Sequence, residues 1–295
     1  MALPSDLLDA LAAPQAMPAL RELDDSRRLT ALFPELESAR DFKQPELHYY
    51  DVLGHSLAAV AAVDATMGTG ADGRELREAS AWIDFEESFE RDIEGIPLRS
   101  LLRLACLLHD VAKPATATIL EGRLRFPRHG PTGADLMAER LPSLGFGEEA
   151  TRFLCAMIRY HLRPGELVRN YPPTDHAVRR FVTALDGHVL PLMLLNMADG
   201  MATRGPNYTR ENFRRHCGFL NYVVARSVGV MEDDGYEALI TGHDLLTELD
   251  LQSGRLLGAV LTSVRQAHEQ GSIASRDEAL ALARITLAGL QATER

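Results

Sequence analysis

The chain has 295 residues, of which 46% are hydrophobic, and a formal net charge of −11 at pH 7. A chain of this length and hydrophobic content can bury a large core, which excludes an intrinsically disordered protein. The acidic balance argues against a general polyanion-binding surface, although it is compatible with a local arginine cluster around a small phosphate.

Targeting features and cysteine content both indicate a cytoplasmic protein. No run approaches the roughly 18 apolar residues of a membrane span, and the N-terminal stretch lacks the basic region that opens a signal peptide. The three cysteines, Cys106, Cys155 and Cys217, are well separated and lie in apolar helical patterns. We expect buried thiols in a reducing compartment and no disulfide framework.

The first elements in chain order are short helices. Residues 1–45 are predicted to form two or three of them, an N-terminal helical segment punctuated by prolines. The next helix is predicted over about residues 48–65, and its apolar spacing turns His55 inward. An inward histidine is either a core residue or a ligand, and both interpretations stay open here.

Residues 66–96 form an acidic insert. Trp82, Phe85 and Phe89 recur within it at helical spacing, so a helix that docks a small aromatic stripe is expected. A packed excursion is the default interpretation, and a lid or a dimer contact are the alternatives.

The most informative helix follows Pro97. Apolar residues recur at helical spacing from Leu98 onward, so one face is predicted to be buried. His109 lies on that face with Asp110 beside it, and Pro114 cannot continue the helix. Burying an unpaired ionised aspartate costs several kcal/mol, so it needs a cation or a hydrogen-bonded partner. A metal ion would satisfy the imidazole and the carboxylate together.

Lys113 follows His109 by one helical turn in a chain that has only two lysines. A specific role for its compact ammonium group is one interpretation. A favourable interaction with the helix dipole is the other.

A β-hairpin is predicted within residues 115–127, where two short runs flank Glu121-Gly122. His129 opens the helix that comes next. Arg125 and Arg128 lie in this region and are expected to face either a phosphate or solvent.

The second half contributes two further candidate ligands. His161 ends the apolar face of a helix that begins near Ala150, and Arg163 follows where that helix stops. Asp199 shares a face with leucines of a helix over about residues 191–201. Because aspartate is rarely buried unpaired, Asp199 is either a hydrogen-bonded core acid or a metal ligand.

Residues 207–295 are predicted to be helical throughout. They contain a second His-Asp pair, His243-Asp244, directly after Thr241-Gly242. Threonine or aspartate at this place caps a helix, so we interpret the pair as a cap and not as a second metal site.

Four imidazoles and two carboxylates therefore form a candidate ligand set from successive helices: His55, His109, Asp110, His129, His161 and Asp199. A set of nitrogen and oxygen ligands suits Mn, Fe, Co, Ni, Zn or Mg. In a two-metal site, Asp110 would bridge the ions.

The order His55, His109-Asp110, Asp199 resembles the HD superfamily of metal-dependent phosphohydrolases. His129 and His161 match the two further histidines of its binuclear members. Five segments also resemble the C-terminal half of bacterial tRNA nucleotidyltransferases (CCA-adding enzymes): HYYDVLGHSLAAV, LACLLHDVAKPAT, RFPRHGPTGADLM, IRYHLRP and ITGHDLLTELDLQSGRLLGAVL.

This second resemblance runs from about residue 5 to residue 285 and has two departures. The sequence shows no Gly-Ser turn followed by the D-x-D metal pair of the nucleotidyltransferase head, so the resemblance does not imply CCA addition. The acidic insert 66–96 has no counterpart in the pattern, and we expect it to influence access to the site.

The resemblance implies an all-α fold, namely an HD-domain helical bundle with one small hairpin and a helical C-terminal region. The expected divisions are 1–45, an HD domain over 46–205 and a C-terminal region over 206–295. A homodimer and the absence of any membrane association are further expectations.

It also implies a phosphodiesterase or nucleotidase that acts on 2′,3′-cyclic nucleotides or similar small phosphoesters. One or two divalent ions (Mn, Ni, Co, Fe or Mg) would activate a hydroxide, with Asp110 and Lys113 as catalytic groups. Arg125, Arg128 and Arg163 would contact the substrate phosphate. The acidic charge favours a small substrate over intact tRNA.

Three alternatives remain at this stage. The chain could be a non-catalytic helical module that binds RNA or tRNA. It could carry out another HD chemistry, such as dNTP hydrolysis or di-iron oxygenation. In the third alternative the metal serves folding alone.

Overall fold

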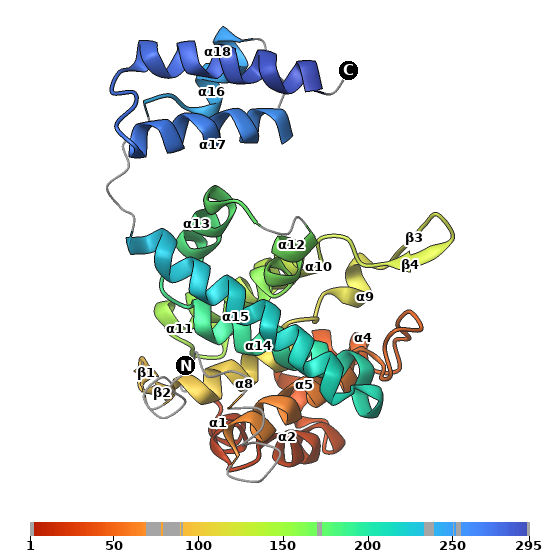
Figure 1. Ribbon diagram of the computed structural model, residues 1–295. Coiled ribbons are helices and arrows are strands. Elements are labelled where there is room, and N and C mark those ends of the chain that lie inside the picture. Colours follow the sequence, from red (N-terminus) through yellow and green to blue (C-terminus); the bar gives the residue numbers. More distant parts are fainter. Residues whose placement is uncertain are drawn as a thin grey trace. The chain divides into compact units, whose positions relative to one another are not determined.

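The computed structural model describes residues 3–68, 78, 89, 91–169, 173–232, 239–249, 251 and 255–293, and it is mainly helical (Figure 1). The chain divides into two units, Met1–Glu232 and Asp233–Arg295. The all-α fold predicted from the sequence is confirmed.

The first unit carries most of the elements. Its helices are α1 (Ser5–Ala12), α2 (Ala16–Asp25), α3 (Arg28–Leu32), α4 (Glu35–Ala39), α5 (Val52–Met67), α8 (Leu98–Leu108), α9 (Lys113–Thr116), α10 (His129–Ser143), α11 (Glu148–Tyr160), α12 (Arg163–Arg169), α13 (Asp175–Ala184), α14 (Val189–Arg204) and α15 (Arg210–Glu232). A 3-10 turn, Gly205–Asn207, joins the last two. The short helices α1 to α4 occupy the N-terminal segment, where the sequence predicted two or three.

Two antiparallel hairpins complete this unit. The strands β3 (Thr118–Leu120) and β4 (Arg123–Arg125) form the hairpin expected within residues 115–127. The strands β1 (Asp92–Ile93) and β2 (Ile96–Pro97) form a second hairpin that the sequence analysis did not predict.

Helix α8 lies at the centre of the first unit, in contact with α1, α5, α11 and α14. Ten of its eleven residues are buried. The sequence predicted one buried face, but neighbours cover this helix on several sides, and even Ser100 and Arg103 are buried. The helix ends at Leu108, so His109 and Asp110 lie in the turn that follows it. Pro114 lies in the first turn of the next helix, α9, where proline is well tolerated.

Arg103 is a buried cation on α8 that ties three elements together. Its guanidinium donates to the carbonyl oxygens of Leu11 at 2.7 Å and Ala13 at 2.9 Å, at the end of α1. It also lies 2.7 Å from an Asp64 carboxylate oxygen on α5. Arg103 therefore links the end of α1 and helix α5 to the centre of the unit.

Helix α5 begins later than the predicted residue 48. The Asp51 side chain accepts a hydrogen bond from the Gly54 N–H at 2.6 Å and caps the helix at Val52. His48 therefore lies in the preceding loop, while His55 lies in the first turn of the helix.

Most of the acidic insert, including Trp82 and Phe85, lies outside the described residues. Phe89 is described, and it is buried in the core of the first unit. The aromatic helix stays a prediction.

The division between the units lies at residue 232, not at the predicted residue 205. Helix α15 packs on α13 and α14, and its residues Phe213, Cys217 and Leu220 belong to the core of the first unit. The sequence pattern of this helix does not reveal its packing partners, so it was predicted to belong to the C-terminal region.

The second unit consists of α16 (Gly242–Glu248), α17 (Arg255–Glu269) and α18 (Arg276–Thr293), with a core of its own. Thr241 and Asp244 form a capping box: Asp244 N–H donates to the Thr241 hydroxyl, and the Asp244 carboxylate accepts from Thr241 N–H at 2.6 Å. The cap interpretation of Asp244 is confirmed. The His243 side chain lies outside the described residues.

Cys106, Cys155 and Cys217 are free thiols, and the first and third are buried. Burial raises the pKa of Cys217 to about 12. Among the described residues, no single helix is long and apolar enough to cross a membrane; α13 and α14 with its 3-10 extension meet that test only as a pair bent by 98°.

The substitution Arg103→Met tests the tie between α8 and the N-terminal helices. Burial raises the pKa of Asp64 above its ordinary value, and the Arg103 charge opposes that shift. Without the cation, an ionised Asp64 is left buried, so we expect the free energy of unfolding to fall by about 3–5 kcal/mol at pH 7. Urea unfolding measures this.

The loss should shrink as the pH falls from the further raised pKa of folded Asp64 toward the ordinary pKa of this carboxyl in the unfolded chain, because the folded protein then binds a proton that neutralises the buried charge. The double variant Arg103→Met with Asp64→Asn is the control and should lack this pH dependence. A loss that is equal at pH 5 and pH 7 would contradict the assignment to Asp64.

Candidate metal centre

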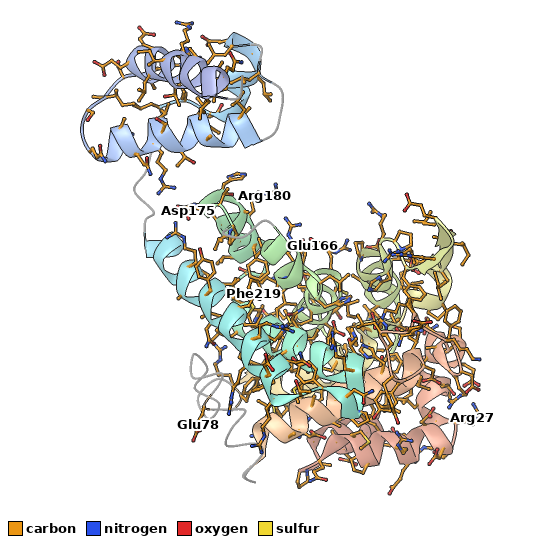
Figure 2. All side chains as sticks on the ribbon, turned by 45° about the vertical axis from the view of Figure 1, so that its right-hand side comes forward. Arg27, Glu78, Glu166, Asp175, Arg180 and Phe219 are labelled. Atoms are coloured by element: carbon orange, nitrogen blue, oxygen red, sulfur yellow. The ribbon has the colours of Figure 1, made fainter. Side chains whose placement is uncertain are left out.

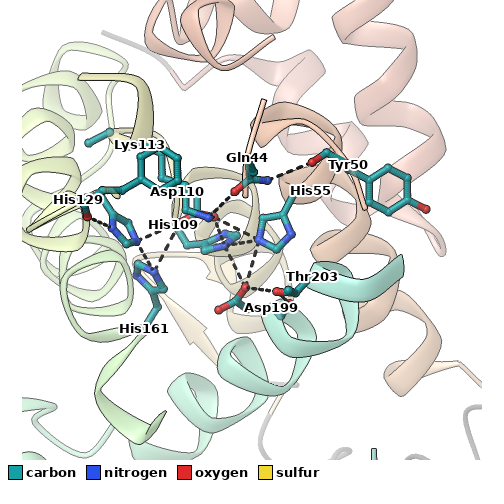
Figure 3. A network of polar contacts seen from close by, with 12 residues as sticks. Gln44, Tyr50, His55, His109, Asp110, Lys113, His129, His161, Asp199 and Thr203 are labelled. Carbon is teal, nitrogen blue, oxygen red and sulfur yellow. Dashed lines mark hydrogen bonds and ion pairs between the residues drawn. The ribbon is translucent and has the colours of Figure 1, made fainter. Parts of the chain in front are cut away.

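The predicted ligands come together at the centre of the first unit (Figure 3). His55 projects from α5, His109 and Asp110 from the turn after α8, His129 from the start of α10, His161 from the end of α11 and Asp199 from α14. Their potential ligand atoms form two groups, each within 4.8 Å. The first group is His55, His109 and Asp199, and the second is Asp110, His129 and His161.

Three of the histidines are oriented by the same local hydrogen bond. The Nδ1 atoms of His109, His129 and His161 each lie 2.7 Å from the carbonyl oxygen three residues earlier in the chain. A carbonyl only accepts, so each Nδ1 carries a proton, and in the neutral imidazole each Nε2 presents a lone pair. Such a bond to the second ring nitrogen is the usual support of a metal-binding histidine.

The first group is compact. His55 Nε2 lies 3.1 Å from His109 Nε2 and 3.1 Å from an Asp199 oxygen. His109 Nε2 lies 3.7 Å from that same oxygen.

The second group has nearly the same dimensions. His129 Nε2 lies 3.1 Å from His161 Nε2. Asp110 Oδ1 lies 3.2 Å from His129 Nε2 and 3.6 Å from His161 Nε2.

Asp110 joins the two groups. While Oδ1 faces the second group, Oδ2 lies 3.2 Å from His55 Nε2 and 3.1 Å from His109 Nε2. The side chain is 1% exposed, so water does not solvate its charge. A carboxylate in this position can bridge two cations, as the sequence analysis expected.

The donor set fits divalent cations. Two Nε2 lone pairs that face each other at 3.1 Å repel unless a positive charge lies between them. Two ligands about 2.0–2.1 Å from one ion, at angles of about 90–109°, lie about 2.8–3.4 Å apart. The spacings of 3.1 and 3.2 Å in the two groups fall in this range, whereas those of 3.6 and 3.7 Å are somewhat longer. The residues therefore can hold one or two ions of the kind that imidazole and carboxylate ligands bind.

The electrostatics of the first group favour positive charge. Burial lowers the pKa of His109, but the nearby Asp110 and Asp199 outweigh it and raise this pKa to about 10. Burial also lowers the pKa of His55, but Asp110 and Asp199 again outweigh it, so this pKa is raised above its ordinary value. The pKa values of Asp110 and Asp199 are well below the ordinary range, because the histidines around them outweigh burial.

His161 differs from these two histidines. Burial, helped by the charge at His109, lowers the pKa of His161 to about 3. A neutral imidazole is the form that binds a metal.

Lys113 lies beside the centre, where its ammonium group is 2.6 Å from Asp110 Oδ2 and 2.6 Å from the Gln44 side-chain oxygen. It also lies over the Phe126 ring, 5.6 Å from its centroid. Lys113 does more than interact favourably with the helix dipole, because its side chain is buried and forms an ion pair with the bridging carboxylate of Asp110. Gln44 was missed, since a single glutamine in a loop carries no signal in sequence.

Helix α14 supplies two supporting contacts that were also missed. The Asn196 amide donates to the His161 carbonyl oxygen at 2.9 Å, and the Thr203 hydroxyl donates to the Asp199 carbonyl oxygen at 2.9 Å. Asn196 is a polar residue in an apolar stretch, the same signal that identified Asp199.

Two of the three predicted phosphate arginines lie near the centre. Arg128 and Arg163 line a cleft of about 990 Å³ to which His129 also belongs. Arg125 lies exposed on β4 and is not among the residues that line this cleft.

Residues 87–186 match a family model described as the HD domain. This part of the chain is similar to the HD domain. The matched segment contains His109, Asp110, His129 and His161, whereas His55 and Asp199 lie outside it. The ligand set therefore extends beyond the matched HD segment on both sides.

Two curated proteins are similar to nearly the whole chain. One is the CC-adding tRNA nucleotidyltransferase of Thermus thermophilus, with 27% identity over 94% of this chain and 54% of the relative. The other is the A-adding tRNA nucleotidyltransferase of Deinococcus radiodurans, with 27% identity over 91% of this chain and 62% of the relative. The chain thus spans between half and two thirds of the length of these relatives.

Metal content should separate the two groups. After loading with Mn²⁺ and desalting, we expect two ions per wild-type chain, one in Asp199→Asn and in His161→Ala, and none in Asp110→Asn, because Asp110 faces both groups. Elemental analysis measures the stoichiometry. Asp25→Asn, an exposed substitution on α2, is the control and should retain two ions. Equal losses in all three variants would contradict two separate groups.

Gly130 is expected to set the distance between α10 and α11. A Cβ added there would lie 3.0 Å from the Arg159 carbonyl oxygen and 3.1 Å from that of Ile158, which orients His161. Gly130→Ala should therefore move His129 and His161 apart, lower the unfolding free energy by about 1–3 kcal/mol and cost one bound ion.

Thermal unfolding and metal content measure these effects. Gly218→Ala in α15 meets no neighbouring atom and serves as the control. It should leave the melting temperature equal or higher, because alanine favours helix. A wild-type melting temperature and metal content in Gly130→Ala would contradict the close approach.

Proposed function

We propose that this chain is a metal-dependent phosphohydrolase, specifically a phosphodiesterase or nucleotidase for 2′,3′-cyclic nucleotides or similar small phosphoesters. The observation that supports it best is the pair of His/Asp groups joined by Asp110. The HD match supports the coarser statement, a place in the metal-dependent phosphohydrolase superfamily.

Divalent ions held by the two groups would supply Lewis acidity, which promotes ionisation of water near neutral pH and polarises phosphoryl oxygens. The overall reaction consumes one water. A new P–O bond forms from the water oxygen, one P–O ester bond breaks, and the departing oxygen takes a proton from the water. HD-type hydrolysis of this kind needs no further cofactor.

The chain's own residues position these components. Nδ1–H hydrogen bonds to backbone carbonyls fix three imidazole rings, and Asp110 keeps the two groups in register. The Lys113 ammonium group forms an ion pair with Asp110 and donates a hydrogen bond to Gln44, both at 2.6 Å. We therefore assign Lys113 as a positioning residue for the bridging carboxylate rather than a direct phosphate contact. Arg128, exposed beside His129, is the cation that we assign to the substrate phosphate.

The similarity to tRNA nucleotidyltransferases does not extend the proposal to intact tRNA. The net charge of −11 disfavours a large polyanion on the general surface. A small phosphoester as substrate, a homodimer and a cytoplasmic location are parts of the proposal.

Hydrolysis of 2′,3′-cyclic AMP and of bis(p-nitrophenyl) phosphate tests the proposal, with Mn²⁺, Ni²⁺, Co²⁺ or Mg²⁺ added separately. Asp110→Asn should lower kcat by at least about 1,000-fold, because this variant is expected to retain neither ion. Lys113→Met should lower kcat by about 10- to 100-fold, with the KM changed less, as for a group that supports a metal ligand.

Asp25→Asn is the matched control for the charge change and should keep wild-type rates. Two parallel assays test the other HD chemistries. Hydrolysis of a dNTP tests the triphosphohydrolase alternative, and a redox signal from protein loaded with Fe²⁺ tests the di-iron oxygenase alternative. A wild-type protein that contains two ions and hydrolyses none of these esters would overturn the proposal.

A further inference from the structure

The cleft beside His129 has an unusual charge for this acidic protein. The start of α10, the end of α11, α12 and α13 surround its volume of about 990 Å³. Five arginines line it, with one acidic residue, Glu166: Arg128, Arg159, Arg163, Arg179 and Arg180. We call this the arginine cleft. Figure 2 shows Arg180 on α13 and Glu166 on α12.

The arginines differ in how far the protein itself neutralises them. Arg163 lies 2.8 Å from Glu166, and Arg159 forms an ion pair with Asp135. Arg128 and Arg180 are exposed, and within the described residues neither has an ion-pair or hydrogen-bond partner for its side chain. These two cations are available to a ligand.

The distribution of the charges indicates an extended anion. A single phosphate can contact at most a few guanidinium groups, and these arginines come from four separate helices or helix ends. A compact polyphosphate likewise concentrates its charge at one place. A nucleic-acid strand spaces one charge per nucleotide, which suits cations that are spread along a groove.

Aromatic rings lie among the arginines. Phe126, Tyr160 and His176 line the same cleft, and Tyr160 and Phe126 are partly exposed. Aromatic rings within a basic groove are the combination that binds single strands, where bases stack and the backbone follows the positive charge. Stacking of this kind requires unpaired bases.

We propose that the arginine cleft binds a short single-stranded oligonucleotide of a few nucleotides. His129 belongs both to the cleft and to the second His/Asp group, so the strand's terminal phosphoester lies beside the metal centre. This placement of the terminus rests on the proposed function, whereas strand binding rests on the cleft alone.

Fluorescence anisotropy with 5′-fluorescein-labelled hexauridylate tests the strand, in buffer with EDTA so that no hydrolysis occurs. We expect saturable binding that weakens roughly 20- to 50-fold between 50 and 200 mM NaCl, the dependence for three or four phosphate contacts on a single strand. Arg128→Glu and Arg180→Glu should each weaken binding at least about tenfold, and Arg180→Lys should retain most of it.

Arg21→Glu, an exposed change of the same charge on α2, is the control and should bind like the wild type. No saturable binding would overturn the proposal, as would equal weakening by Arg21→Glu. Displacement of the probe by ATP as readily as by unlabelled hexauridylate would also overturn it, in favour of a compact polyphosphate.

Metal-dependent hydrolysis of bis(p-nitrophenyl) phosphate by the wild type separates the two proposals. Hexauridylate binding without hydrolysis supports the cleft and overturns the proposed function. Hydrolysis without hexauridylate binding does the reverse.

Discussion

The Asp110 carboxylate is the group on which the arrangement of this unit depends. It is buried, and both its oxygens face histidine nitrogens at 3.1 to 3.6 Å, with the Lys113 ammonium at 2.6 Å. A lone carboxylate in such a place is too costly to bury, so everything around it must supply positive charge or hydrogen-bond donors. Five helices accordingly end or pass at this point, and each contributes a nitrogen that faces the Asp110 carboxylate. The groups are His55 from α5, His109 from the end of α8, Lys113 from α9, His129 from α10 and His161 from the end of α11.

The packing explains how these groups are held at such short distances. Helix α8 is enclosed by α1, α5, α11 and α14, so its end is fixed from several sides. The closeness of α10 and α11 at Gly130 then determines how far His129 lies from His161. Arg103, inside the helix that ends at Leu108 just before His109, extends this rigidity to the N-terminal helices. A site on helix ends that are packed in this way is held more precisely than one on loops.

Most of the residues that cluster at this centre could be predicted from the sequence, because a polar side chain on an apolar stripe is anomalous. Asp199 and His161 interrupt or end apolar stripes, and Asp110 follows a helix with a long apolar face. Gln44 could not be predicted in this way, because a loop has no periodic pattern of apolar residues against which a polar side chain would stand out. The β1–β2 hairpin was missed, although its turn, Glu94-Gly95, has the same two residues and the same positive φ angles as the predicted turn at Glu121-Gly122. Helix α15 was assigned to the wrong unit because amphipathic periodicity shows that a face is buried, but not against what.

The two His/Asp groups are not equivalent in their surroundings. The first group takes Asp199 from α14, whose side chain is 16% exposed, and its histidines are fully buried. The second group includes His129, which lines the arginine cleft. A net charge of −11 repels anions from most of the surface, whereas five arginines gather beside His129. Such a contrast concentrates an anionic ligand at one place instead of spreading it over the protein. On the proposed function, the arginine cleft therefore brings the substrate phosphate to His129, on the side of the second group.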